Sequence, residues 1–103
     1  MNALSVPPVA AQDDKAFELL RYWAVDQGFQ CSIRVGAYSS QGADNEIKAW
    51  GIVLADIAQH LSDALAAQGL GSREKMLKAV MAEFASEIGS PSSSRQGALD
   101  KPA

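Results

Sequence analysis

The chain has 103 residues, of which 48% are hydrophobic and 20% are charged. This length allows one domain at most. The apolar fraction is ordinary for a globular protein, which excludes a fibrous or wholly disordered chain. The formal net charge of -3 provides neither the basic surface that nucleic acids require nor a polybasic membrane anchor.

The chain contains no apolar run near the roughly 20 residues of a membrane span, and its N-terminus lacks the basic start of a secretion signal. Its single cysteine, Cys31, cannot form an internal disulfide, which is typical of a reducing compartment. We therefore expect a cytoplasmic protein that does not contact a membrane. Cys31 lies on the apolar side of a predicted strand, so we interpret it as a structural thiol rather than a nucleophile.

Residues 1–12 contain two prolines and no charge, and are predicted to form an extended N-terminal arm. Apolar side chains then recur at three- and four-residue steps, the spacing of an amphipathic helix. Aspartates can cap the start of this segment, and Gly28 can end it. The pattern predicts a first helix over about residues 14–27, with Trp23 on its core side.

A two-residue alternation of apolar and polar side chains runs from Phe29 to Ala37 and predicts a strand. Residues 39–45 are rich in turn-forming side chains. The alternation resumes briefly over Glu46–Trp50, which predicts a second strand and a β-hairpin.

The helical period returns after Gly51 and continues until the glycines at 69 and 71. Ser72 can cap a further helix that ends at Gly89. Because the connection is short, the two helices are expected to lie antiparallel. Residues 90–103 hold one large aliphatic side chain and are predicted to form a disordered Ser/Pro-rich tail.

The predicted order is α-β-β-α-α over residues 13–89, a single small α+β domain. A two-stranded antiparallel hairpin would be covered on one face by three helices. Two strands make a marginal sheet, and a domain this small buries little surface. We therefore predict a homodimer, in which a second copy extends the sheet or packs against its free face.

Three ionisable residues, Asp56, His60 and Asp63, are spaced along one side of the second long helix. Two carboxylates beside an imidazole can hold a divalent metal or position the histidine as a base. A solvent-exposed helical ion pair explains the same spacing. The chain has no second histidine, and we favour the ion pair.

The outward-facing residues of the predicted hairpin are Arg34 and Lys48, with Trp50 at its end. Such residues suit a protein interface, where tryptophan is enriched. Two cations on an acidic chain are too few for nucleic acid, which is not expected as a partner. The glycines form no phosphate-binding motif, and the chain carries no recognisable catalytic constellation, so no catalytic residue and no cofactor are predicted.

The segments Glu18–Trp23 and Ala49–His60 resemble a family of short bacterial proteins of unknown function, in which a Trp-Gly pair opens a helix carrying Asp-x-x-x-His. The resemblance implies no substrate, cofactor or activity. It directs attention to five positions: Arg21, Trp50, Gly51, Asp56 and His60.

Three functions remain open from the sequence. The first is a non-enzymatic protein-interaction module, acting as a homodimer. The second is a small metal-binding protein or enzyme centred on Asp56, His60 and Asp63. The third is a sensor that holds an anionic metabolite on Arg21 or Arg34, which only the fold could bring together.

Overall fold

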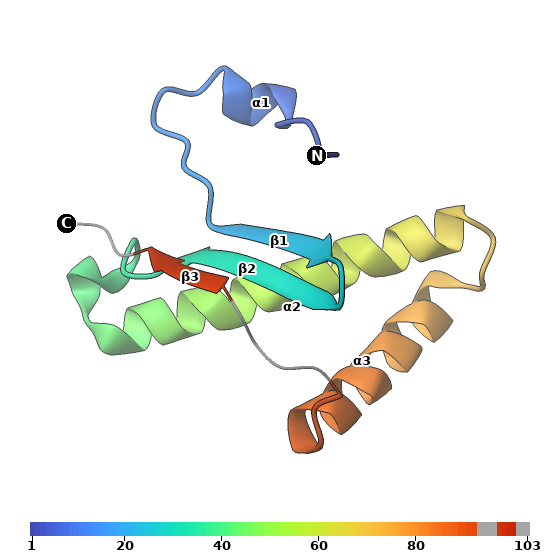
Figure 1. Ribbon diagram of the computed structural model, residues 1–103. Helices are drawn as coiled ribbons and strands as arrows, with labels where there is room; N and C mark the ends of the chain where they lie inside the picture. Colours follow the sequence, from blue (N-terminus) through green and yellow to red (C-terminus); the bar gives the residue numbers. More distant parts are fainter. Residues whose placement is uncertain (93–96, 101–103) are drawn as a thin grey trace.

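The computed structural model describes residues 1–92 and the backbone of residues 97–100. Its elements, in chain order, are α1 (Pro8–Ala11), β1 (Leu20–Val25), β2 (Gly28–Arg34), the 3-10 turn η1 (Ser39–Gln41), α2 (Ala43–Ala67), α3 (Arg73–Gly89) and β3 (Gly97–Asp100). Figure 1 shows the long helix α2 running along one side of the sheet, with α3 diverging from its far end.

The sheet has the order β1-β2-β3, with β1 and β2 antiparallel and β3 parallel to β2. In the β1–β2 register, Tyr22 lies opposite Cys31 and Ala24 opposite Phe29. Gln27 occupies the tight turn between them with a φ of 66°, a left-handed conformation that short connections between twisted strands favour. The predicted small α+β domain with an antiparallel hairpin is therefore confirmed, although only one of the two strands, β2, is formed by residues that were expected to form one.

The predicted helix over residues 14–27 is wrong: residues 20–25 form strand β1. Leu20, Tyr22 and Ala24 alternate with Arg21 and Trp23 as a strand requires, and the same residues also match the helical spacing. The ladder formed with β2 decides between the two periods, because it satisfies the backbone groups and brings the apolar side chains of both strands to one face. The described residues form three α-helices, but the first is the single turn α1.

The predicted second strand over Glu46–Trp50 is also wrong, because these residues lie within α2, which begins at Ala43. Five alternating residues are too few to separate a strand from a helix. Asp44 and Glu46 fall in the first turn of α2, where acidic side chains favour helix formation. The strand predicted from Phe29 to Ala37 corresponds to β2, which ends earlier, at Arg34.

The predicted pair of helices after Gly51 is confirmed as the second part of α2 and α3. Gly69, with a φ of 81°, stops α2, and the Ser72 hydroxyl caps α3 by accepting a hydrogen bond from the Lys75 amide at 3.2 Å. Where the helices meet, Arg73 Nε donates to Asp63 Oδ1 at 2.6 Å.

The two ends of the chain also differ from expectation. The predicted extended arm contains α1, which in the described residues contacts no other helix or strand. Residues 97–100 form strand β3 beside β2, so the predicted disordered tail is wrong for these four residues. Residues 93–96 and 101–103 of that tail lie outside the described residues.

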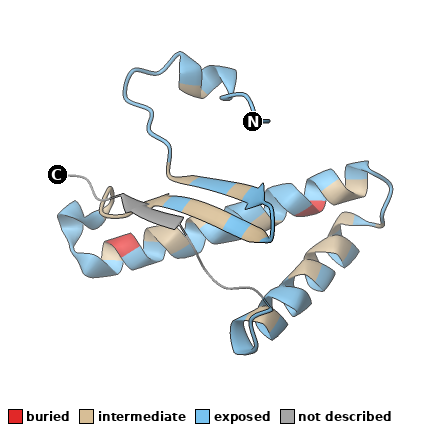
Figure 2. Ribbon diagram, viewed as in Figure 1, coloured by how far each residue is buried: buried red, intermediate tan, exposed pale blue. Residues whose placement is uncertain are grey.

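Residues 1–92 do not enclose an apolar core. Among residues 1–92 no apolar side chain is buried, and the two buried residues are Glu46 and Ser62. Figure 2 shows these two against helices that are otherwise half-buried or exposed. In the part of the chain that is described, no helix is long and apolar enough to cross a membrane.

Candidate functional site

The carboxylate of Glu46 joins the segment after β2 to the first turns of α2. Its Oε2 accepts hydrogen bonds from the Gly36 amide at 3.0 Å and from Trp50 Nε1 at 2.7 Å, and its Oε1 accepts one from the Tyr38 amide at 2.8 Å. Asn45 adds a fourth bond, from Nδ2 to the Tyr38 carbonyl at 2.7 Å. We call Glu46, Gly36, Tyr38 and Trp50 the carboxylate latch.

The charge of Glu46 is stabilised by these donors. The Gly36 amide lowers the pKa of the carboxyl group most, and the Tyr38 amide and the Trp50 indole lower it further, while partial desolvation acts in the opposite direction. A carboxylate that accepts several N–H bonds is held in its ionised form. Glu46 therefore performs a structural task that leaves it unsuited to act as a proton donor near neutral pH.

Arg34, Lys48 and Trp50, the three predicted interaction residues, do not lie together on one sheet as the predicted hairpin implied. Lys48 and Trp50 lie on α2, whereas Arg34 ends β2. Trp50 is half-buried and bonded to Glu46. Because Glu46–Trp50 is helical, Arg34 and Lys48 are not cross-strand neighbours, and the predicted pair of cations on the sheet does not form.

Arg21 and Arg34 do come together, at Glu18. Arg21 Nε and Nη2 each lie 3.1 Å from a carboxylate oxygen of Glu18, and Arg34 Nε donates to the Glu18 backbone carbonyl at 2.9 Å. Arg34 also lies over the Phe17 ring, 6.0 Å from its centroid. Since Glu18 already neutralises Arg21, this pair of arginines resembles a structural brace for the start of β1 more than an open anion site.

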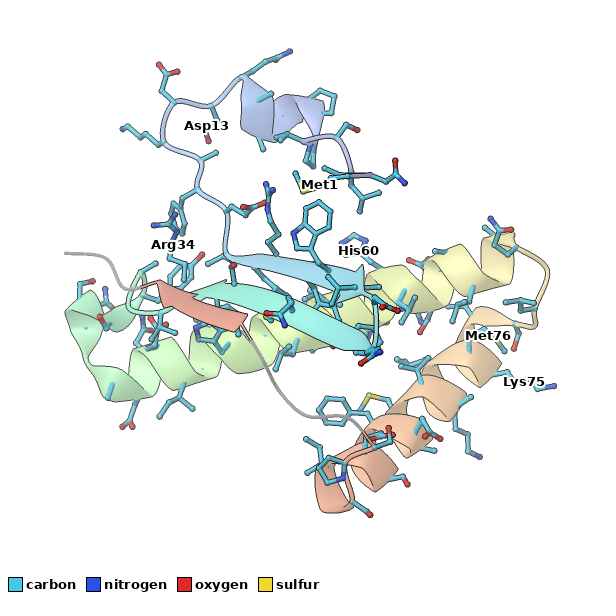
Figure 3. All side chains as sticks on the ribbon, in the orientation of Figure 1. Met1, Asp13, Arg34, His60, Lys75 and Met76 are labelled. Atoms are coloured by element: carbon cyan, nitrogen blue, oxygen red, sulfur yellow. The ribbon has the colours of Figure 1, made fainter. Side chains whose placement is uncertain are left out.

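The three residues of the predicted metal site do not converge. His60 Nε2 lies 3.2 Å from Asp56 Oδ2, and both side chains are exposed, while Asp63 is bonded to Arg73. Figure 3 shows His60 on α2, well away from Arg34. Within the described residues, no group of three or more His, Cys, Asp or Glu side chains is arranged to hold a metal ion. The geometry is that of a helical ion pair at i, i+4.

A row of exposed aliphatic side chains follows α2. Its members share an arc of about 80° on the helical wheel. They are Ile47, Leu54, Ile57 and Leu61, with exposed fractions between 42% and 69%, and we call them the apolar band. In the described residues α2 contacts η1 and α3, and these contacts leave the apolar band exposed.

Helix α3 carries a similar exposed row, formed by Met81, Phe84 and Ile88. The half-buried residues of α3, which include Leu77 and Val80, lie next to this row. Soluble monomers seldom leave contiguous apolar surface of this kind open to water. The spacing of apolar residues along a helix shows which side chains share a face, but it does not show what covers that face.

The fold has a counterpart among solved structures. A protein from the photosynthetic bacterium Rhodopseudomonas palustrus CGA009, provisionally named a pyruvate dehydrogenase, superposes with a TM-score of 0.66 at 22% sequence identity, over 91% of this chain and 90% of that one. At this identity the likeness shows the fold alone. No curated protein matches the sequence.

The sequence profile of one family matches residues 3–92, which span everything from the N-terminal arm to the end of α3. The match confirms the expectation of a family of unknown function. The chain belongs to DUF5076, a family defined by a domain of unknown function.

Proposed function

We propose that the chain is a non-enzymatic protein-interaction module that acts as a homodimer in the bacterial cytoplasm, with a second copy covering the apolar band. One observation carries the proposal: residues 1–92 bury no apolar side chain, although large apolar side chains are abundant. Burial of apolar surface is the main favourable term in folding, so a chain that buries so little needs a partner to supply the missing contacts.

The amount of exposed apolar surface supports this proposal. A stable interface removes about 800 Å² from each partner, and each large aliphatic side chain that becomes fully buried contributes about 1.5–3 kcal/mol. The apolar band and the row on α3 together offer seven large side chains. Lys48 lies next to Ile47 in the sequence and supplies a charged rim, the arrangement that protein interfaces favour.

The ionisable groups support a non-enzymatic role. Glu46 is occupied by the carboxylate latch, Asp63 by Arg73, and Glu18 by Arg21. A catalytic acid or base needs a group that is free to exchange protons with a bound substrate. In the described chain these carboxylates instead hold elements together.

Sedimentation equilibrium of the full chain tests the proposal. The wild type is expected to sediment at twice the chain mass at micromolar concentration. Ile57→Glu, which places a charge in the apolar band, is expected to weaken self-association by tenfold or more, because an unpaired charge is costly to bury.

Ile52→Glu is the matched control. Ile52 is also exposed, at 60%, and lies on the same helix about 180° from the centre of the apolar band. It is expected to associate like the wild type. A monomeric wild type at high micromolar concentration would overturn the proposed function, and equal effects of the two substitutions would contradict the apolar band as the contact surface.

A further inference from the structure

Strand β1 has an unpaired edge. The sheet order puts β2 on one side of β1 only, and the Arg34 amide donates to the Leu19 carbonyl at 2.9 Å. In an antiparallel ladder the hydrogen-bonded pairs alternate, so Arg21, Trp23 and Val25 direct their backbone groups towards β2. Leu20, Tyr22 and Ala24 direct theirs away from it.

Within the described residues this edge stays open. None of the hydrogen bonds of residues 1–17 reaches β1: they join residues of this segment to one another. Asn2, Ala3 and Leu4 line a shallow cavity of about 180 Å³ together with β1, and α1 contacts no other helix or strand in this part of the chain. Natural proteins protect such edges with prolines, bulges, charges or a covering loop. Strand β1 has no proline and one charge, Arg21, and residues 2–4 face it without a hydrogen bond to its backbone.

We infer that β1 pairs antiparallel with β1 of a second copy, with Tyr22 opposite Tyr22 of that copy, so that two three-stranded sheets become one sheet of six strands. This inference rests on the proposed self-association. It adds to the contact at the apolar band a second contact between the same two copies, with a defined register. A pairing of a strand with itself is isologous, as a twofold dimer requires.

The register follows from the residues of β1. A register centred on Tyr22 gives each of the three outward-directed residues a partner in the second copy: Leu20 lies opposite Ala24, and Tyr22 lies opposite Tyr22. Each of these hydrogen-bonded pairs exchanges two bonds. It also places Arg21 opposite Trp23 of the second copy, a cation–π combination. The same two residues already lie close within one chain, with the Arg21 guanidinium 6.0 Å from the Trp23 ring centroid.

The neighbouring registers are poorer. Centring on Arg21 sets two arginines directly opposite each other, and like charges in cross-strand positions are destabilising. Centring on Trp23 leaves Leu20 without a partner inside the strand. Of these registers, only the one centred on Tyr22 pairs all three outward-directed residues of β1 with one another and avoids a charge conflict.

The side chains on the other face of the sheet, away from Arg21 and Trp23, also favour this pairing. Tyr22 stacks on Phe29 with ring centroids 5.3 Å apart and an interplanar angle of 28°, and both rings are exposed. Pairing of β1 strands brings the two stacked pairs beside the shared twofold axis. The aromatic surface of each copy then meets its equivalent instead of water.

Spin labels on β1 test the register. In a Cys31→Ser background, single cysteines at positions 20, 22 and 24 are labelled in turn, and distances between copies are measured by electron paramagnetic resonance. Position 22 is expected to give the shortest distance. Positions 20 and 24 are expected to give equal, longer distances, because each is offset from its equivalent by four residues, about 14 Å along the strand.

A proline substitution tests the edge without labels. Ala24→Pro removes an outward-directed amide while the ladder to β2 keeps its bonds, and it is expected to weaken self-association on the order of tenfold or more. Ala24→Val retains the amide and is the control, and circular dichroism of both variants verifies the fold.

The outcomes separate the inference from the proposed function. Unequal distances at positions 20 and 24, or no dipolar coupling in a sample that sediments as a dimer, would overturn the β1 pairing and leave the homodimer standing. Equal weakening by Ala24→Pro and Ala24→Val would also overturn it. A wild type that sediments as a monomer would instead overturn the proposed function.

Discussion

Trp50 Nε1 donates a 2.7 Å hydrogen bond to Glu46 Oε2, one turn earlier on α2. The same carboxylate accepts the amides of Gly36 and Tyr38, so a contact within one helix also fixes the segment that follows β2. Glu46 therefore makes most of the side-chain hydrogen bonds that connect the segment after β2 to α2, and Asn45 adds one more.

Replacement of Glu46 is expected to lower the thermal stability of the protein. Glu46→Ala leaves three donors without their acceptor, and unsatisfied donors shielded from water are costly. Glu46→Gln keeps one acceptor oxygen, so its melting temperature should fall between those of Glu46→Ala and the wild type. Thermal unfolding followed by circular dichroism measures the order. Glu83→Gln, at an exposed glutamate of α3, is the control, and a Glu46→Ala protein as stable as this control would contradict the role of the latch.

The contribution of the latch is expected to depend on pH. Because the folded-state pKa of Glu46 is lowered from its ordinary value of 4.5, its ionised form stabilises the fold fully at pH values above 4.5. That stabilisation is lost as the pH falls through the lowered folded-state pKa. The difference in melting temperature between wild type and Glu46→Gln should be constant near neutral pH and shrink below pH 4.5.

This comparison isolates Glu46 from a second carboxyl group. The pKa of Glu87 is also lowered, by the hydroxyl and the amide of Ser92, but Glu87 is present in both proteins and its effect cancels in the difference. A difference in melting temperature that grows on acidification would contradict the assignment.

Two glycines, one inside α2 and one just beyond its C-terminal end, are expected to respond in opposite directions to alanine. Gly51 lies inside the helix with nothing within 4 Å of an added Cβ, so Gly51→Ala should raise the free energy of unfolding by about 0.5–1 kcal/mol. Gly69 has a φ of 81°, a conformation that a Cβ makes unfavourable. Gly69→Ala should therefore lower the free energy of unfolding by about 1–2 kcal/mol. Urea unfolding measures both values. Effects of the same sign would contradict the helix end at Gly69.

Zinc is expected to leave the protein unchanged. His60 and Asp56 form an exposed pair, and the third predicted ligand, Asp63, is engaged by Arg73 at 2.6 Å. Two ligands in solvent fall short of the closed four-ligand set of structural zinc sites. Isothermal titration should give no saturable heat with the wild type or with His60→Ala. A saturable heat that disappears in His60→Ala would restore the metal-binding hypothesis.

The candidate site shows what a local pattern can reveal. Trp50 could be singled out as a tryptophan next to a glycine, but Glu46 was missed, although a glutamate four residues before a tryptophan is a recognisable helical pair. The pair becomes visible only when residues 46–50 are assigned to a helix. The donors at Gly36 and Tyr38 are backbone amides, which no side-chain motif reports.

The amino-acid sequence by itself determined the elements whose signals are local. Helix α3 follows from the Ser72 cap and its apolar spacing, the end of α2 from Gly69, and β2 from its alternation. Only the tertiary structure decided that residues 20–25 form a strand, because their side chains satisfy both periods and a ladder to β2 makes the choice. The same holds for the outward direction of the apolar band: periodicity groups side chains onto a face, but the neighbour that would cover that face belongs to the three-dimensional arrangement.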